Sequence, residues 1–460
     1  MSSNYVAIII ASLPAFFGLV GCAPFQQYRT IASDNCVCNV KNADEKCAQQ
    51  MLQHVTTEGH NAYHLGFIEF DDQGQLWDRD NQKNVVIGKI KQLAASQDLL
   101  MVVFVHGWKH SAAPNDPNIN TFREVLEDLT DAENKMSEHP RTVFGLYLGW
   151  RGESITPFLW LDNLTFWDRK NTAHKVGHGG VTEVLSELES IRDSQPDRDG
   201  DGNRTKLAVI GHSFGGAVVS SALTQLLENR LVAAKQSERE EKLIKGFGDI
   251  VVLINPAFEA TRYTPLADMS TEVQQYDAAQ LPILAILTSE ADWATKYAFK
   301  IGRYFSTAFE TNRYMGRKNA TTLQMESINE GQANVTAVGH FADYQTHTLK
   351  PLSGHEKRDL SEPKIDAAMR VNNLLTVSDY WADDHPGSEI PFGKVMLNRG
   401  LNSAAHNPYL LAYVDKNLIS DHNDIDDPRV MEFIKQLIML SSHSKQDVTK
   451  AKVLLQNRTK

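Results

Sequence analysis

The sequence predicts an α/β fold, with a mostly parallel central sheet, helices on both faces and an inserted segment before the last strand. Three observations support this prediction. Continuous apolar runs of strand length recur along the chain, as expected for strands buried on both faces. Segments with apolar residues at helical spacing separate them, and one long stretch late in the chain interrupts the alternation. Strands that alternate with helices form parallel sheets, because parallel neighbours need a crossover connection.

The expected elements can be placed in order. The stretch from Tyr63 to Asp80 alternates apolar and polar residues around Asp-Gln-Gly and predicts a strand hairpin. Buried strands are predicted at 99–107, 142–150, 207–210, 249–255, 283–288 and 408–415. Helices are predicted at 121–135, 181–191, 217–231 and 429–440. The interruption runs from Lys296 to Leu401 and contains short strands such as 334–341.

The composition is that of a globular protein. The chain has 460 residues, of which 42% are hydrophobic and 22% are charged, so it can bury a large core. Its formal net charge of -11 argues against a nucleic acid or another polyanion as partner.

The N-terminal residues predict a signal peptide or an anchor. Tyr5 to Gly21 is apolar throughout, and its length suits the hydrophobic region of a signal peptide. The four residues "LVGC", which end at Cys22, resemble a bacterial lipobox, in which the signal is cut before the cysteine and the cysteine is acylated. No Lys or Arg precedes the apolar run, so an uncleaved anchor is the alternative. Both versions predict a membrane-anchored protein of the bacterial cell envelope, on its periplasmic face or at the surface.

The other three cysteines lie close together at the start of the mature chain. They are Cys36, Cys38 and Cys47, too few for a zinc site without histidine ligands. An exported protein favours one disulfide, from Cys47 to either Cys36 or Cys38, with one thiol left over.

One short motif carries the chemistry. The strand Leu207–Ile210 leads into "GHSFGG", in which Ser213 stands between Gly211 and Gly215. A turn this tight crowds any neighbouring side chain, which explains both glycines. It presents the serine hydroxyl above the carboxyl edge of the sheet. The backbone N–H of Phe214, at the start of the next helix, can stabilise an oxyanion there.

These residues resemble the esterase and lipase branch of the α/β-hydrolase superfamily. The resemblance rests on "GHSFGG", on "FVHGW" at Phe104–Trp108 and on the order of strands and helices. It covers Leu99 to Leu440 apart from the insertion. It implies that the backbone N–H of Trp108 is the second oxyanion donor and that His106 orders its loop. It also implies a triad in the chain order serine, acid, histidine.

The resemblance places the acid after a late strand. "PILAILTSEADWAT", from Pro282 to Thr295, is an apolar strand followed by acidic residues, and Asp292 is the predicted acid. Glu290, close to the strand end, and Glu259, after "LINPAF", are the alternatives.

The base is expected on the loop after the last strand. His422 fits, because the strand 408–415 precedes it and the helix 429–440 follows it. His347 and His340 are the alternatives, although more than a hundred residues follow them.

The expected activity is hydrolysis of carboxylic esters, with a small-molecule or lipid ester as substrate. Ser213 attacks the carbonyl and forms an acyl-enzyme, His422 takes its proton, and Asp292 orients the imidazole. The N–H groups of Phe214 and Trp108 hold the oxyanion. This chemistry needs no metal and no organic cofactor. Amide hydrolysis or acyl transfer on the same triad is the nearest alternative, and a non-catalytic, lipid-anchored binding protein is another.

The expected organisation follows from these assignments. It comprises a signal peptide or anchor (1–21), an N-terminal arm (22–58), a hydrolase core (59–295), an insertion or lid (296–401), a closing strand with the base loop and a helix (402–445), and a tail (446–460).

Two further stretches have more than one interpretation. Asp197, Asp199 and Asp201 resemble the first half of a calcium-binding EF-hand loop, but position twelve is an alanine, which favours an exposed turn. Thr156 to Asp168 is dense in aromatic and aliphatic side chains. This stretch suits an acyl-pocket wall or a lid hinge, or ordinary packing on the sheet.

Overall fold

The computed structural model describes residues 25–32, 36–56, 62–152, 162–196, 204–307, 309–358, 365–444, 447–451 and 453. Within these residues, a twelve-stranded sheet runs through the molecule in the order β1-β2-β3-β5-β4-β6-β7-β8-β14-β11-β13-β12. All neighbours from β3 to β11 in this order are parallel. The strands are β1 (Val37–Asn39), β2 (Leu52–Thr56), β3 (Ala62–Phe70), β4 (Leu99–Val105), β5 (Thr142–Trp150), β6 (Lys206–His212), β7 (Ile250–Ile254), β8 (Leu284–Ser289), β11 (His347–Pro351), β12 (Glu389–Phe392), β13 (Val395–Arg399) and β14 (Tyr409–Val414).

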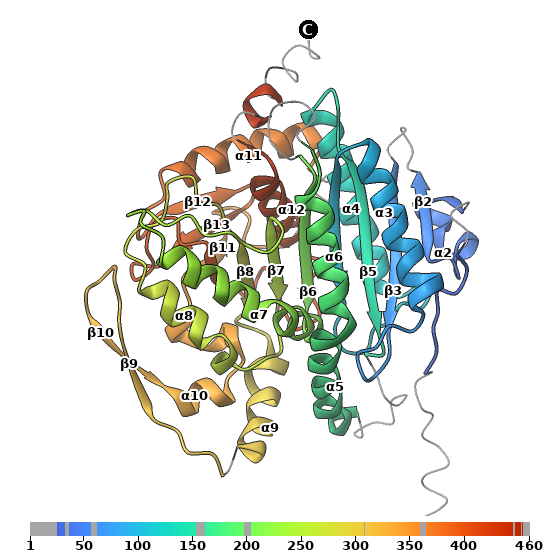
Figure 1. Ribbon diagram of the computed structural model, residues 1–460. Helices are drawn as coiled ribbons and strands as arrows, with labels where there is room; N and C mark the ends of the chain where they lie inside the picture. Colours follow the sequence, from blue (N-terminus) through green and yellow to red (C-terminus); the bar gives the residue numbers. More distant parts are fainter. Residues whose placement is uncertain are drawn as a thin grey trace, which may run out of the picture.

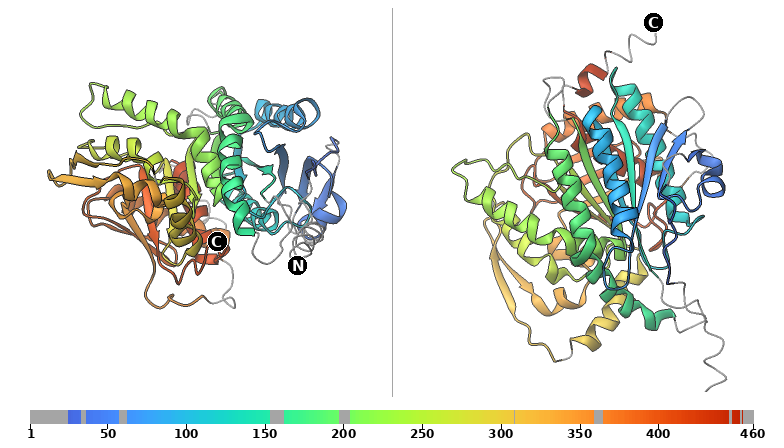
Figure 2. Two further views of the ribbon diagram at one scale, coloured as in Figure 1. Left: turned by 90° about the horizontal axis from the view of Figure 1, so that it is seen from below. Right: turned by 45° about the vertical axis from the view of Figure 1, so that its right-hand side comes forward.

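Helices cover both faces of the sheet (Figures 1 and 2). One face carries α3 (Asn84–Ser96), α6 (Thr182–Asp193) and α7 (Phe214–Lys235), and the other carries α4 (Pro117–Met136), α11 (Ala367–Ala382) and α12 (Pro428–Ser442). Successive strand residues point into opposite cores. In β4, for example, Val103 belongs to the first core and Val102 to the second, and both are fully buried. This explains why the central strands read as continuous apolar runs.

The α/β architecture expected from the sequence is confirmed. The predicted core strands appear as β4, β5, β6, β7, β8 and β14, and the predicted helices as α4, α6, α7 and α12, each within a few residues of the expected bounds. The expected hairpin is reduced to β3, a turn and one isolated bridge between Phe70 and Leu76.

The stretch 334–341 is not a strand, contrary to the prediction. Asn329 caps the short helix α10 (Glu330–Val335), because its side chain accepts a hydrogen bond from Gln332 N. The chain then runs along the loop after β7, where Ala260 N donates to Thr336 O at 2.9 Å. The alternating apolar residues of this stretch therefore pack against that loop.

The inserted segment 296–401 extends the sheet with further strands and also places a hairpin and two helices beyond the carboxyl edge of the sheet. β11, β13 and β12 extend the sheet beyond β14, with β13 antiparallel to both of its neighbours. A separate antiparallel hairpin of β9 (Tyr314–Lys318) and β10 (Met325–Asn329), with α9 (Phe299–Ser306) and α10, lies beyond the carboxyl ends of the parallel strands, at the bottom of Figure 1.

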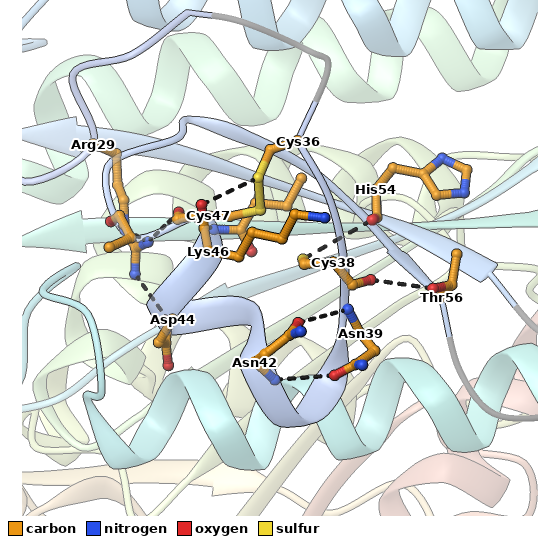
Figure 3. The surroundings of a disulfide bond; sticks show 12 residues. Arg29, Cys36, Cys38, Asn39, Asn42, Asp44, Lys46, Cys47, His54 and Thr56 are labelled. Carbon is orange, nitrogen blue, oxygen red and sulfur yellow. Dashed lines mark hydrogen bonds and ion pairs between the residues drawn. A yellow bond between two sulfur atoms is a disulfide. The ribbon is translucent and has the colours of Figure 1, made fainter.

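The N-terminal arm also differs from the expectation, because it forms an edge of the sheet. β1 pairs with β2, and β2 pairs antiparallel with β3. A disulfide joins Cys36 to Cys47, which is one of the two pairings left open by the sequence, and the thiol of Cys38 is buried and free (Figure 3). The fully buried Arg29 ties this part to the core, with Nε donating to Ala112 O at 2.8 Å.

Two properties of the described residues bear on partners. None of the helices formed by these residues is long and apolar enough to cross a membrane. The same residues contain no cluster of three or more His, Cys, Asp or Glu side chains that could hold a metal ion.

Candidate active site

Ser213 occupies a strained turn between β6 and α7. Its backbone has φ 55° and ψ -119°, a region that non-glycine residues rarely adopt. Two hydrogen bonds, one with the end of β7 and one with the loop after it, hold the turn. Ser213 N donates to Ile254 O at 2.9 Å, and Ala257 N donates to Ser213 O at 3.1 Å. The turn therefore fixes the serine at the carboxyl edge of the sheet.

The glycines around Ser213 are required by close contacts. A Cβ at Gly215 would lie 2.0 Å from the carbonyl oxygen of Val105 and 2.6 Å from that of His106. A Cβ at Gly211 would lie 2.8 Å from the carbonyl oxygen of Gly215. Any side chain at either position would therefore push α7 away from the strand ends.

His422 and Asp292 complete a line of hydrogen bonds with Ser213. Ser213 Oγ lies 2.6 Å from His422 Nε2, and His422 Nδ1 lies 2.9 Å from Asp292 Oδ1. Asp292 follows β8 and His422 follows β14, which are adjacent parallel strands. The carboxyl ends of β6, β8 and β14 thus bring together three side chains that are far apart in the sequence.

Asp292 is held in its charged form. Its side chain is completely buried. Burial disfavours the charge, but the attraction of His422 and the hydrogen bonds from Thr295 outweigh this effect, so the pKa of Asp292 lies below its usual value. A charged Asp292 accepts the Nδ1 proton of His422, so the unprotonated Nε2 faces Ser213 Oγ.

The strand order, the strand–turn–helix at Ser213 and the chain order of the three side chains decide the fold type. The chain has an α/β-hydrolase fold.

No family model and no curated protein sequence matches the chain. Similar solved structures include the phospholipase PlaB from Legionella pneumophila, at 16% identity and a TM-score of 0.21 over 42% of this chain and 39% of that chain. Its complex with thio-NAD matches at 15% identity and a TM-score of 0.22, over 50% and 48% of the two chains. A Trichoderma reesei cutinase in complex with a C11Y4 phosphonate inhibitor matches at 14% identity and a TM-score of 0.18, over 46% of this chain and 77% of that chain. The matches span less than half of the phospholipase chain.

The loop between β4 and α4 lies directly against the serine of this α/β-hydrolase fold. A Cβ at Gly107 would be 2.8 Å from Ser213 Cβ. His106 is buried and stacks on Trp150, with ring centroids 5.6 Å apart. Its Nδ1 donates to Gly107 O at 2.9 Å, its Nε2 accepts from Trp150 N at 3.0 Å, and burial lowers its pKa to about 4. A neutral His106 therefore orders the loop that carries Trp108.

Asn255 and His212 hold the backbone of His422 and were not predicted from the sequence. Asn255 Nδ2 donates to His422 O at 3.0 Å, and His212 Nε2 donates to the same oxygen at 3.1 Å. Asn255 Oδ1 accepts from Ser289 N at 2.9 Å. Burial lowers the pKa of His212 to about 3, which keeps it neutral. These contacts connect the carboxyl ends of β6, β7 and β8 with the loop after β14.

Thr295 and His340 form a second line of contacts behind the acid. Thr295 N donates to Asp292 Oδ1 at 3.0 Å, and the Thr295 hydroxyl donates to Asp292 Oδ2. His340, an alternative base in the sequence analysis, contacts this hydroxyl and not the serine. His347, the other alternative, is buried in β11, where Nδ1 lies 2.8 Å from Thr346 Oγ1.

The alternative acids lie in other ion pairs. Glu290 lies 3.8 Å from Lys416 at the surface. Glu259 is buried, and its carboxylate contacts Lys170, Arg262 and Arg303. Asp292 is thus the acid that the structure places beside His422.

Several predicted features fall outside the described residues. They are the signal or anchor with the lipidation residue Cys22, the acidic stretch 197–203 considered for calcium, and residues 156–161 of the aromatic stretch.

Proposed function

We propose that this protein is a serine hydrolase of carboxylic esters. The observation that carries the proposal is the unbroken line of hydrogen bonds from Ser213 Oγ through His422 to Asp292, at 2.6 Å and 2.9 Å. Three side chains in this relation are what a general base needs to activate a serine nucleophile.

The proposed reaction begins with Ser213. Its Oγ attacks the ester carbonyl carbon while its proton moves to His422 Nε2, and the buried carboxylate of Asp292 stabilises the imidazolium that forms. The N–H groups of Phe214 and Trp108 would hold the tetrahedral oxyanion.

The intermediate then collapses. His422 gives its proton to the leaving alcohol, and the acyl group remains on Ser213. A water molecule, deprotonated by His422, attacks the acyl carbon, and proton return to Ser213 Oγ releases the carboxylic acid. Amide hydrolysis and acyl transfer could use the same steps, so the leaving group has to be tested.

We also propose that the N-terminus attaches the protein to a membrane of the bacterial cell envelope. The support is the apolar run from Tyr5 to Gly21, followed by Cys22. Acylation of Cys22 and retention of the apolar run are the two forms that this anchor can take.

The test is labelling with a fluorophosphonate, together with turnover of nitrophenyl esters and the matching nitroanilides. We expect the wild-type protein to be labelled and to prefer esters. Ser213→Ala should be neither labelled nor active. Ser221→Ala is the matched control, because Ser221 lies on the same helix α7 and contacts His174. Labelling of Ser213→Ala at the wild-type level would contradict the proposal.

A further inference from the structure

A row of large apolar side chains is exposed directly after the acid. Trp293, Tyr297, Ile301 and Tyr304 are 64%, 50%, 58% and 56% exposed. They are spaced by four, four and three residues along η5 (Ala294–Ala298) and α9, the spacing of one helix face. We call these four residues the aromatic stripe. Large exposed apolar patches of this kind mark surfaces that meet a partner or a membrane.

The opposite side of the same helix is fixed in the site. Thr295 is buried and bonds to Asp292, and Phe299 is buried beneath the cation of Lys170. The aromatic stripe is therefore presented outward from a rigid support. α9 lies beyond the carboxyl ends of the strands (Figure 1), the same edge at which Ser213 sits.

The first described residue also lies at this edge. Phe25, the first described residue, is 55% exposed. Its ring is 4.7 Å from that of Trp77, and Arg151 Cζ lies 5.1 Å from its centroid, just beyond the carboxyl end of β5. The residues that precede Phe25 include the apolar run Tyr5–Gly21.

The order of strands puts Ser213 between these two features. Along the sheet, β5, β4, β6, β7 and β8 are neighbours, so β6 is the middle strand. With a strand spacing of about 4.8 Å, Phe25 and the aromatic stripe lie roughly 20 Å apart, with Ser213 between them.

We propose that the carboxyl edge of the sheet faces a lipid bilayer, with the aromatic stripe seated among the headgroups and the substrate drawn from that surface. Trp and Tyr favour this level of a membrane, because their rings are apolar and their N–H or O–H groups remain hydrated. Lys300, on the same helix, is half-buried and can extend toward lipid phosphates.

An anchor in the chain before Phe25 supports a membrane rather than a protein as the occupant. An apolar segment that enters the bilayer beside β5 would hold the whole edge against it. The proposed contact of the aromatic stripe with the membrane does not depend on whether the protein is an enzyme. The choice of a membrane lipid as substrate rests on the proposed ester hydrolysis.

The first test measures contact without any reaction. The full-length protein is reconstituted into phosphatidylcholine vesicles, with or without bromine near the headgroup end of one acyl chain, and tryptophan emission is recorded. We expect bromolipid to quench the wild-type protein more than Trp293→Phe, so that the difference reports Trp293. Equal quenching of the two proteins would overturn the proposal.

The second test separates access from chemistry. Ile301→Glu/Tyr304→Glu should reduce hydrolysis of a long-chain ester in vesicles at least tenfold and leave hydrolysis of a dissolved short-chain nitrophenyl ester unchanged. The matched control is Val232→Glu/Leu243→Glu, which alters two exposed apolar residues at or beyond the end of α7, away from this edge. The control should not change either rate.

The outcomes distinguish the two proposals. If the wild-type protein hydrolyses neither ester, the proposed function fails, whereas the quenching test still decides membrane contact. If the Ile301→Glu/Tyr304→Glu variant hydrolyses both esters at the wild-type rate, the membrane proposal fails and ester hydrolysis stands. The membrane proposal would also fail if the protein formed a dimer without lipid and the stripe substitutions dissociated that dimer, because a second copy would then cover the stripe.

Discussion

His340 Nε2 lies 3.0 Å from the hydroxyl oxygen of Thr295. The hydroxyl has one proton, which it donates to Asp292, so it must accept the Nε2 proton of His340. Burial lowers the pKa of His340 to about 4, and its ring is therefore neutral near pH 7. Neutral His340 thus orients the hydroxyl of Thr295, and this hydroxyl orients the carboxylate of Asp292.

Removing this hydroxyl should slow the reaction without weakening substrate binding. We expect Thr295→Val to lower kcat about tenfold, or about 1.4 kcal/mol, because Asp292 loses one hydrogen bond to its charged form. KM should not change, since Thr295 contacts the acid and not the substrate. Thr295→Ser keeps the hydroxyl and should restore kcat. If Thr295→Val lowered only the thermal stability and left kcat unchanged, Thr295 would have a purely structural role.

The base and the nucleophile should behave as one unit. We expect His422→Ala and Ser213→Ala each to lower kcat about a millionfold, and the double variant to be no slower than either single variant. Steady-state kinetics on a nitrophenyl ester measure this. His347→Ala should retain most of the activity, because His347 is buried in β11 and contacts Thr346. If the double variant lost the sum of the two single-variant losses in activation free energy, His422 and Ser213 would not act in the same step.

Glu259 should stabilise the fold in a pH-dependent way. Burial raises its pKa, but the attraction of Lys170 outweighs burial and lowers the pKa to about 2 from an ordinary 4.5. A folded-state pKa below the ordinary value means that Glu259 stabilises the fold above pH 4.5, and that this contribution is lost as the pH falls toward 2.

We therefore expect Glu259→Gln to lower the free energy of unfolding by about 3 kcal/mol at neutral pH, because it leaves the buried Lys170 without its carboxylate. The difference from the wild-type protein should shrink as the pH falls below 4.5. Urea unfolding at several pH values measures it. Glu272→Gln is the control, because Glu272 pairs with Lys235 at the surface and should contribute less than about 1 kcal/mol.

The disulfide should stabilise the N-terminal edge of the sheet. The cysteines Cys36 and Cys47 are 11 residues apart, and a loop of this length predicts a loss of about 3 kcal/mol in the Cys36→Ser/Cys47→Ser variant. Thermal unfolding with and without a reductant measures the effect. The variant should be insensitive to the reductant, whereas the wild-type protein should lose stability in it.

The anchor can be tested at a single residue. If Cys22 is acylated, Cys22→Ser should block maturation or release the protein from membranes in detergent-free fractionation. Unchanged membrane association, with the apolar run still present by mass spectrometry, would identify an uncleaved anchor.

The positions of the candidate site residues could be predicted where local patterns fix them. Gly211 and Gly215 follow from the turn that Ser213 requires, and the turn follows from an apolar strand that runs into an apolar helix. Asp292 and His422 could be predicted because each lies just past the end of a buried strand, and parallel strands end at one edge. Their catalytic roles remain predictions.

The supporting residues could not be predicted, because their contacts cross long stretches of chain. His340 is 45 residues from Thr295, and Asn255 is 167 residues from His422. Neither has a local signature, and His340 lies in a segment whose alternating apolar residues predicted a strand. The edge strands of the N-terminal arm were missed for another reason. β1 and β2 are short, and the polar composition around them is typical of a linker.

The adjacency of β8 and β14 makes the geometry of the site independent of the length of the chain that joins them. Thr288 pairs with Tyr413 and Ser289 with Val414, so the two strands end level with each other. The spacing between Asp292 and His422 is therefore set by strand pairing, although 130 positions separate them in the sequence. Chain can be added, removed or even cut between α9 and α10 while the two halves stay joined through the sheet. The intervening segment is thus free to diversify, and substrate access can change without any change in the reacting groups.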